Sequence, residues 1–467
     1  MTVLKFIKLS FFSLLFLFSL NSFSQFSKTH YIPPIPTTGD GSSTPASNQY
    51  IYISTPSEDS FNVTINPVGG TSFEVPVSNA DPYELIVTGG ESSQLFINAE
   101  DTSVVYDNKG YIIEGPNLFY VTVKFFAGGS YQAAGLVSKG ESGLGTEFRV
   151  GTFENLGTSQ DDYVENFLNF VSVIATTDNT IINFSEFGNG VTIVNGINPP
   201  DQILLDRGES YILSIKPCES CPYGGFEPPF NTWDLNSNNE NGLIGTLVQS
   251  NKPIVVNSGS LAGSNINFND NGISGQDAGI DQLVGADKIG NEYIFVRGLG
   301  PDEIERPLIV AHVDNTDVFI NGNFYQTIAF AGEYISIPTS FYNVSYPSGN
   351  YQNDPSNVNA DTDLTNNEPP TGVSSNMYVN TTENVFAYQV IGGIRAGSPL
   401  PWFGGTVYTS GVANQGMFFV PPLNCKTPKS VDNIPYINQI GTDEFTGDVT
   451  IITESGSELL SIKSISL

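Results

Sequence analysis

The sequence predicts an all-β protein built from tandem repeated β-rich units. Short segments rich in β-branched and aromatic residues recur along the chain and are bounded by Gly, Pro, Asn or Asp, which is typical of strands. Clear examples begin at Gln49, Leu118, Asn169, Lys252 and Asn384. Beyond the N-terminal region, no segment of about a dozen residues keeps an apolar stripe at helical spacing. Similar phrases also return in one order, so a few copies of one unit account for the strands.

The composition is that of a folded and strongly acidic protein. Of the 467 residues, 39% are hydrophobic and 14% are charged, and 48 acidic residues against 17 basic ones give a net charge of −31. The hydrophobic content is typical of a globular chain and not of a disordered one. The negative charge would repel phosphate backbones and anionic lipid surfaces, so we expect no nucleic acid and no membrane surface among the partners.

Residues 1–24 are typical of a secretory signal peptide. Two lysines precede an apolar run from Leu9 to Leu20, which is too short to span a bilayer, and small polar residues follow it. No cysteine follows the run to accept a lipid, and the sequence has no second apolar segment of membrane-spanning length. We therefore expect export with cleavage near Ser24, a mature chain without a transmembrane segment, and a secreted or cell-surface location.

Four phrases recur in the same order in two copies, which begin at Gly145 and Gly290. The opening phrase places Gly, a polar residue, Glu and an aromatic residue ahead of an apolar strand, as in "GTEFRV" and "GNEYIFV". Two strands joined through Asp-Asn-Thr come next, then a strand that begins after Gly-Glu, and finally a closing apolar strand. Asn and Asp tolerate the left-handed backbone of a tight hairpin, which explains their place in the turn.

Weaker copies flank these two. "HYIPPI" at His30 and "FFVPPL" at Phe418 are expected to open the first and the last copy, and the segment from Tyr131 is expected to close the first. The last copy stops before any closing strand, so we expect it to be truncated or completed by strands from elsewhere. The expected domains are the signal peptide (1–24), three units (25–144, 145–289 and 290–416) and a partial fourth unit (417–467).

Two architectures fit units of this length. Six or seven strands in each copy could close as tandem β-sandwich-like modules, or each copy could contribute four-stranded blades to a β-propeller.

The cysteines are Cys218, Cys221 and Cys425. In an exported chain, the CxxC of Cys218 and Cys221 is expected to form a local disulfide that stiffens a Pro-bounded loop. The alternative, a redox or zinc site, is disfavoured because zinc needs more ligands and the chain adds only two histidines. Cys425 is left over, which indicates a missing or intermolecular partner.

No catalytic constellation stands out. His312 is the only histidine well inside the repeated region, and its counterpart in the preceding copy is Thr176, so we interpret it as a hairpin strand residue and not as a general base. Paired carboxylates of a glycosidase are defined by a separation in space that the sequence does not show. The repeats use their acids in turns, and we expect no enzymatic activity.

Calcium is the one metal for which the sequence offers candidate ligands. An insertion clusters Asp361, Asp363 and Glu368, although a solvated insertion between strands explains the same residues. "NFNDNG" from Asn267 imitates the spacing of a calcium loop but lacks the first Asp and the final Glu. We expect no other cofactor.

The repeated phrases resemble a known family. "DQLVGADKIGNEYIFV" from Asp281, "VFING" from Val318 and "SNKPIVVNSGSLAG" from Ser250 are similar to the N-terminal domain of the IgGFc-binding protein family, particularly its bacterial members from Bacteroidetes. The resemblance extends from about residue 30 to the end of the sequence. It implies an extracellular, β-rich interaction domain of the kind found in larger surface or mucus proteins, without specifying a ligand.

Three functions are compatible with these observations. The first is a non-enzymatic secreted or cell-surface binding or adhesion protein, which recognises an extracellular protein, glycoprotein or glycan through the inserts around residues 218–240, 264–284 and 350–372. The second is a carbohydrate-binding or glycan-acting surface protein, and the third is a structural surface or matrix component. For the second function the candidate aromatic residues are Tyr223, Trp233 and Trp402.

Overall fold

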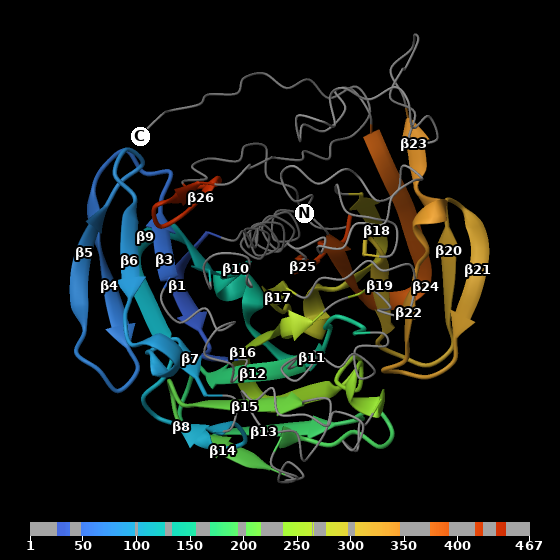
Figure 1. Cartoon of the computed structure of the whole chain (residues 1–467), viewed down its shortest axis with the longest axis horizontal. Helices are drawn as coiled ribbons and strands as arrows, with labels where there is room; N and C mark the ends of the chain where they lie inside the picture. The colour runs from blue at the N-terminus through green and yellow to red at the C-terminus, as the bar shows by residue number, and fades with distance from the viewer. Residues whose placement is uncertain are drawn as a thin grey trace, which may run out of the picture.

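The protein is almost entirely β-structure in the computed structural model, which confirms the all-β prediction. Three large sheets follow one another along the chain and lie around a common centre (Figure 1), in agreement with the predicted tandem units. The expected signal peptide lies outside the residues that the structure describes. Those residues are 26–37, 48–98, 101–126, 133–155, 169–194, 202–215, 237–263, 265, 277–297, 304–345, 374–391, 416–423 and 436–444.

Each sheet is organised around one long strand that pairs with neighbours on both of its edges. These strands are β9 (Tyr111–Phe126), β16 (Leu247–Gly263) and β24 (Ser374–Ile391). The other strands of the first sheet are β1 (Ser27–Ile32), β3 (Asn48–Ser54), β4 (Phe61–Pro67), β5 (Phe73–Val77), β6 (Tyr83–Val87) and β10 (Ala133–Val137).

The second and third sheets repeat this plan. The second adds β8 (Val105–Tyr106), β11 (Gly145–Arg149), β12 (Asn169–Ala175), β13 (Thr180–Ser185), β14 (Ile203–Leu205), β15 (Ser210–Ile215) and β17 (Asp277–Gln282) to β16. The third adds β18 (Gly290–Val296), β19 (Pro307–Ala311), β20 (Thr316–Ile320), β21 (Asn323–Ile328), β22 (Tyr334–Ser336), β23 (Asn343–Ser345) and β25 (Gly416–Phe419) to β24.

Two small strand pairs and several single turns of 3-10 helix complete the described structure. The pairs are β2 (Ile35–Pro36) with β7 (Phe96–Ile97), and β26 (Gln439–Ile440) with β27 (Asp443–Glu444). The 3-10 turns are η1 (Gly90–Ser92), η3 (Gly140–Gly143), η7 (Ser237–Asn239), η8 (Ala286–Lys288) and η9 (Thr339–Phe341).

Each long strand changes partners half-way along and so contributes to two layers. The first half of β16 pairs with β11 and β13, whereas its second half pairs with β12 and β17. At the change, β11 shifts register, because Gly145 lies opposite Ile254 but Glu147 lies opposite Gln249. β18 shifts register on β24 in the same way. We call the strands on the first half the leading layer (β1, β4, β5; β11, β13, β14; β18, β20, β21, β23) and those on the second half the trailing layer (β3, β6, β10; β8, β12, β15, β17; β19, β22, β25).

Apolar side chains of the two layers pack against each other inside each unit. In the third unit, Tyr293 and Met377 of the leading layer share one buried cluster with Ile309 and Ala387 of the trailing layer. Burial of apolar surface between two such layers is a main stabilising contribution. With the long strand counted in both layers, each unit therefore contributes two packed layers of four or five strands to the arrangement around the common centre (Figure 1), which corresponds to the blades of the second expected architecture.

Successive units stack by covering each other's layers. Every residue of β12 is buried, because Val171 and Val173 face the core of their own unit while Phe170 joins the core of the first unit. In the same way, Leu308 and Val310 of β19 pack into the core of the second unit. The outer face of a trailing layer thus packs against the preceding unit, which explains why these strands are apolar on both faces.

In the second unit, the glycine of the opening phrase is required by a close approach to another backbone segment of the same unit. A Cβ atom at Gly145 would lie 2.6 Å from the Cα of Gly285, and one at Gly285 would lie 2.9 Å from the Cα of Gly145. The aromatic residue of the phrase is fully buried in both copies, as Phe148 and Tyr293. The repeated Glu accepts a side-chain hydrogen bond from its own long strand, since Gln249 donates to Glu147 over 2.7 Å. The phrase is therefore structural.

The Asp-Asn-Thr and Gly-Glu phrases form two adjoining turns. Asn179 has a φ of 55°, which is the left-handed backbone predicted for this position. The Asp178 carboxylate accepts a hydrogen bond from the Arg207 amide over 3.0 Å, and the Glu209 carboxylate accepts one from the Asp206 amide over 2.7 Å. The third unit repeats this with Asn315, Asp314 and Glu333. These acids therefore act as turn caps.

The structure corrects the predicted closing strand of the first unit. The segment from Tyr131 contains β10, which pairs with the second half of β9, and β9 itself takes the place that β16 and β24 take in the other units. β25, which includes the first residues of the expected fourth unit, pairs with β24 in the third sheet. The boundaries of the four expected units remain predictions.

Candidate functional site: the insert edge and the buried polar network

The non-repeating inserts of the second unit are bordered by strand ends that lie together. Asn169 pairs with Ile215 on one side and with Ser260 on the other, and Gly263 pairs with Asp277. These positions border inserts 156–168, 216–236 and 266–276. The strand ends that border these inserts therefore lie at one end of the unit, which we call the insert edge.

The third unit has the same arrangement. Val296 lies opposite Asn376, and Ser345 lies opposite Ser374, at the start of β24. Because β24 reverses direction at its change of partners, its far end, where Ile391 pairs with Gly416, belongs to the same edge. Strand ends at this edge border inserts 298–303, 346–373 and 392–415. The Asp-Asn-Thr and Gly-Glu turns lie at the opposite end, beside the bend of each long strand.

The base of the insert edge in the second unit is held by buried side-chain amides. The Asn155 side chain donates to the Asn169 side-chain oxygen and to the Glu240 carbonyl, each over 2.9 Å. The Glu154 amide donates to the Asn265 side chain over 2.8 Å. Burial raises the pKa of the Glu154 carboxyl group. The ends of the inserts are thus joined to one another by a fixed hydrogen-bond framework.

The last strands of the three units, β10, β17 and β25, lie near the centre of the molecule (Figure 1). The Ala133 amide at the start of β10 donates to the Asp277 carboxylate at the start of β17 over 2.8 Å. The starts of these two strands therefore lie side by side. β10 follows residues 127–132 and β17 follows residues 266–276 in the sequence.

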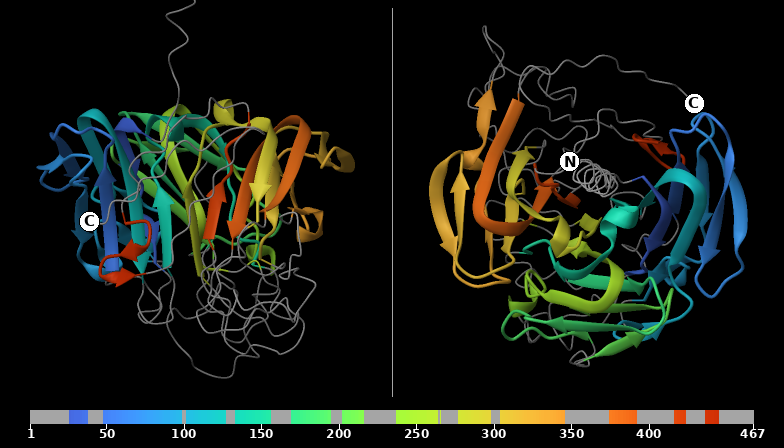
Figure 2. Two further views of the ribbon diagram at one scale, coloured as in Figure 1. Left: turned by 90° about the horizontal axis from the view of Figure 1, so that it is seen from above. Right: turned by 180° about the vertical axis from the view of Figure 1, so that it is seen from behind.

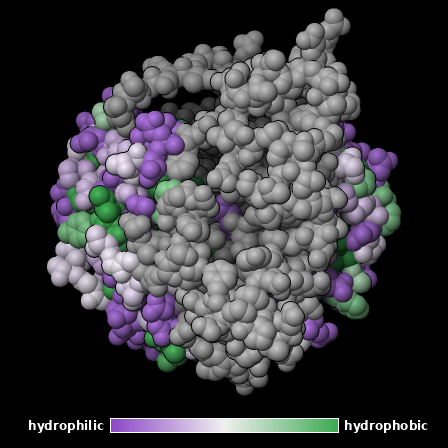
Figure 3. Space-filling view, in the orientation of Figure 1, coloured by the Kyte–Doolittle hydropathy of each residue, from purple (hydrophilic) through white to green (hydrophobic). Residues whose placement is uncertain are grey.

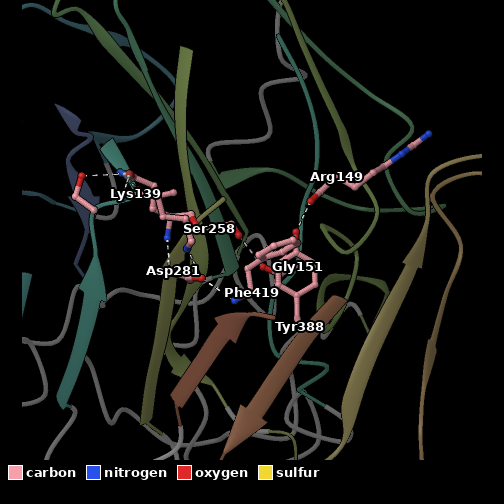
Figure 4. A network of polar contacts seen from close by, with 10 residues as sticks. Lys139, Arg149, Gly151, Ser258, Asp281, Tyr388 and Phe419 are labelled. Carbon is pink, nitrogen blue, oxygen red and sulfur yellow. Dashed lines mark hydrogen bonds and ion pairs between the residues drawn. The ribbon is translucent and has the colours of Figure 1, made fainter. Parts of the chain in front are cut away.

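A buried ion pair joins the three units at this centre. The Lys139 ammonium group lies 2.7 Å from an Asp281 carboxylate oxygen, and their side chains are only 10% and 6% exposed. The same oxygen accepts the Phe419 amide over 2.6 Å, and Figure 4 shows Lys139 and Phe419 on opposite sides of Asp281. Lys139 also donates to the Gln282 carbonyl. Both charges are satisfied inside the protein, so the pair is a structural connection.

Gln282 extends this network into the first unit. Its side-chain oxygen accepts the Lys139 amide over 2.7 Å, and its side-chain nitrogen donates to the Tyr31 carbonyl over 3.0 Å. A similar connection joins the next pair of units, where the Tyr388 hydroxyl donates to the Arg149 carbonyl over 2.6 Å (Figure 4). Tyr31 in β1 and Arg149 in β11 occupy equivalent positions, each directly after the buried ring of its opening strand. Each interface is therefore fixed by a buried polar side chain of the later unit.

His30 is fully buried within the same network. Its Nε2 donates to the Phe119 carbonyl over 3.0 Å, and its Nδ1 lies 3.0 Å from the Ser138 hydroxyl. Burial lowers its pKa to about 4, so the ring is neutral near pH 7. With both ring nitrogens engaged and no access to solvent, His30 is a packing residue.

His312 lies directly after β19, at the contact between the second and third units. Its Nε2 is 3.2 Å from a Glu147 carboxylate oxygen, and its ring meets the Phe386 ring edge-on. Burial lowers its pKa, Glu147 opposes that shift, and Arg149 adds to it. The sequence predicts His312 as a hairpin strand residue, and it lies one residue beyond the strand β19, in contact with framework residues.

Most of the predicted site residues lie outside the described residues. These are Cys218, Cys221 and Cys425, the calcium candidates Asp361, Asp363 and Glu368, the loop from Asn267, and the aromatic residues Tyr223, Trp233 and Trp402. Within the described ranges, no group of three or more His, Cys, Asp or Glu residues could hold a metal ion. The same part of the chain contains no helix long and apolar enough to cross a membrane.

One expected recognition segment is partly framework. Residues 277–282 of the segment 264–284 form β17, and every residue of that strand is buried. Sequence reasoning also missed the Lys139, Asp281 and Gln282 network. Lys139 is more than 140 residues from Asp281 and Gln282, so no local motif could indicate the network.

Comparison with known families places the chain. The family model described as IgGFc binding protein matches residues 133–461, which is well over half of the sequence. The chain belongs to the IgGFc binding protein family. No curated protein matches it significantly.

Among solved structures, one described as a "Ca2+-stabilized adhesin" that "helps an Antarctic bacterium reach out and bind ice" aligns at 11% identity. The alignment covers 85% of this chain and 74% of that chain, with a TM-score of 0.11. A score this low supports no inference about fold or function.

Proposed function

We propose that this member of the IgGFc binding protein family is a secreted or cell-surface protein that binds an extracellular macromolecule through its non-repeating inserts and catalyses no reaction. The observation that carries the proposal is the division of the second and third units into two ends. The repeated residues cap turns and hold register, whereas the inserts that differ between units leave from the insert edge. Loops held on a rigid β framework are a common recognition surface.

Membership in a binding family supports the same function, and the family is usually extracellular or mucosal. The described titratable groups also support it. Lys139 and Asp281 neutralise each other in the interior, and both ring nitrogens of His30 are engaged. The repeated acids Asp178 and Glu209 accept backbone hydrogen bonds in turns. Each of these groups therefore has a structural role that explains its presence.

The surface composition and the net charge bear on the kind of partner that we expect. Figure 3 shows hydrophilic and hydrophobic residues interspersed over the described part of one face. The net charge of −31 disfavours anionic partners, so we expect a protein, glycoprotein or glycan that is neutral or basic at the contact.

The proposal includes several finer expectations. These are a bacterial origin of the Bacteroidetes type, removal of residues 1–24 on export, and a disulfide between Cys218 and Cys221. Calcium bound by Asp361, Asp363 and Glu368 would serve to order an insert.

The experiment is a set of insert replacements in the mature chain. Inserts 216–236, 266–276 and 346–373 are each replaced by a Gly-Ser segment of equal length, and binding to immunoglobulin Fc, to mucin and to a glycan array is measured. We expect at least one replacement to abolish binding while the melting temperature stays within a few degrees of the unmodified protein. The matched control replaces residues 195–201, which are not among the recognition inserts and leave the buried residues Ile193 and Val194 in place.

Two results would contradict the proposal. One is unchanged binding when all three inserts are replaced together. The other is turnover of a polysaccharide or peptide substrate that a single Asp or Glu substitution abolishes without loss of folding.

A further inference from the structure

The outer face of the first unit's trailing layer is covered by a distant part of the chain. In β3, Ile51 and Ile53 face the core of the first unit, so that Tyr50 and Tyr52 point to the opposite face. Tyr50 is 9% and Tyr52 2% exposed. Residues 436–444, which contain β26 and β27, lie against this face, and both views in Figure 2 show that hairpin (red) beside the first sheet (blue).

The contacts of this hairpin are specific. The Gly441 amide donates to the Tyr52 hydroxyl over 2.8 Å, and the rings of Tyr52 and Tyr436 lie 4.7 Å apart. Lys124, which lies opposite Tyr50 on the neighbouring β9, donates to the carbonyls of Tyr436 and Gln439. Its ammonium group also lies 5.4 Å from the centre of the Tyr52 ring. The hairpin thus supplies the acceptors that a half-buried lysine requires.

The same face is an inter-unit interface in the other two units. On β12, Phe170 and Ile174 occupy this face and pack against the first unit. On β19, Leu308 and Val310 occupy it and pack against the second unit. Tyr50 and Tyr52 hold this position on β3, where no earlier unit of the described chain is available to cover them.

We propose that residues 436–444 are a docking segment that takes the place of a preceding unit on the first unit and so closes the open end of the row of units. This inference is independent of the proposed binding function, because it concerns an interface within the chain. It connects the two ends of the described chain across more than 300 residues. It also explains why a face with two tyrosines and a lysine is buried.

The test compares two glycines in hairpin turns. Gly441 has a φ of +57° and Gly322 a φ of +81°, so alanine is strained at either position. A Cβ atom at Gly441 would lie 2.0 Å from the Tyr50 hydroxyl, whereas one at Gly322 would have no atom within 4 Å. Gly441→Ala therefore strains the turn and disrupts docking, while Gly322→Ala only strains a turn.

The measurement is hydrogen exchange by mass spectrometry on the full mature chain, together with nitration of Tyr52. We expect Gly441→Ala to raise exchange of residues 436–444 by about tenfold or more and to make Tyr52 reactive, with Gly322→Ala behaving like the unmodified protein at both places. Tyr52→Phe, which removes only the hydroxyl acceptor of Gly441, should raise exchange in the same segment by a smaller factor.

Equal exchange of residues 436–444 in the two alanine variants would overturn the proposal. Protection of this segment that falls on dilution would overturn it as well, because the segment would then dock between copies of the chain. Loss of ligand binding by insert replacement would not change either measurement, so the two proposals fail independently.

Discussion

The first unit buries a different kind of side chain, at one shared core position, from the two units that follow it. After the register shift on the long strand, the second and third units bury Phe148 and Tyr293, whereas the first buries His30 at the same position. The imidazole is retained there because Phe119 and Ser138 satisfy its two nitrogens. The three units therefore bury a ring-shaped side chain of similar size at the bend. Whether that ring is polar depends on the hydrogen-bond partners beside it in each unit.

A second difference lies at the outer face of the trailing layer. Where Phe170 and Leu308 contact a preceding unit, Tyr50 and Tyr52 contact the hairpin of residues 436–444. The face that receives a whole unit carries mainly aliphatic and aromatic side chains, and the face that receives a small hairpin carries two tyrosines, one of which bonds to the hairpin backbone through its hydroxyl. The polarity of the face therefore follows the size of the element that covers it.

The largest expected effect comes from breaking the connection that the three units share. Asp281→Ala leaves the Lys139 charge and the Phe419 amide buried without their partner, and we expect a loss of about 3 to 5 kcal/mol in the free energy of unfolding. Denaturant unfolding measures it. The matched control is Asp287→Ala, because Asp287 is 70% exposed and its pair with Lys288 is worth about 1 kcal/mol or less. Equal effects of the two substitutions would show that the central pair does not join the units.

The next effect is a pH dependence of stability, which we expect from the first unit and not from the other two. Folding lowers the His30 pKa from 6.5 to about 4, so the unfolded chain binds a proton between these values that the folded chain does not. Stability is therefore complete above pH 6.5 and falls as the pH decreases toward 4. At about 1.4 kcal/mol for each pKa unit, His30 accounts for a loss of about 3 kcal/mol over this range.

His30→Phe, which gives the first unit the residue of the second, should remove this part of the pH dependence. Unfolding free energies at pH 7 and pH 4.5 measure the difference, with Tyr293→Phe as a control that changes an aromatic residue without adding a titrating group in this range. If His30→Phe keeps the full pH dependence of the unmodified protein, another group is responsible for it.

The smallest effects compare the second unit with the third. Asp178→Ala and Asp314→Ala each remove the acceptor of one backbone amide in an exposed turn, and we expect each to lower the unfolding free energy by about 1 kcal/mol. Thermal unfolding measures both. A difference of more than about 1 kcal/mol between the two would show that the turns are not equivalent.

The local parts of this architecture could be predicted from the sequence, because they depend on residues close together in the chain. The Asp-Asn-Thr turn is an example, since the backbone preference of Asn179 acts on its own residue. The place of β9 was missed because its bend contains Glu114-Gly115-Pro116 in place of the Ser250-Asn251-Lys252-Pro253 of β16. The sequence of the β9 bend therefore does not match the repeated phrase found at the bend of β16.

The contacts between units could not be predicted for a different reason. Lys139 follows β10 and Asp281 is the last residue but one of β17, and a charged residue near a strand end ordinarily indicates a solvent-exposed end. Only the stacking of β10 beside β17 turns these two charges into a buried pair, and that stacking depends on the packing of whole layers. The insert edge could be predicted only in part. The repeats locate the inserts in the sequence, but it is the register of the strands that brings the strand ends to one edge.

The division between framework and inserts is tested most directly by measuring ligand binding and melting temperature on one set of variants. The set contains the replacement of inserts 216–236, 266–276 and 346–373 and the double variant Asp178→Ala with Asp314→Ala. We predict that the insert replacement abolishes binding and leaves the melting temperature within a few degrees, while the double variant lowers the melting temperature and keeps the affinity. Binding that survives the insert replacement but is lost in the double variant would contradict this division.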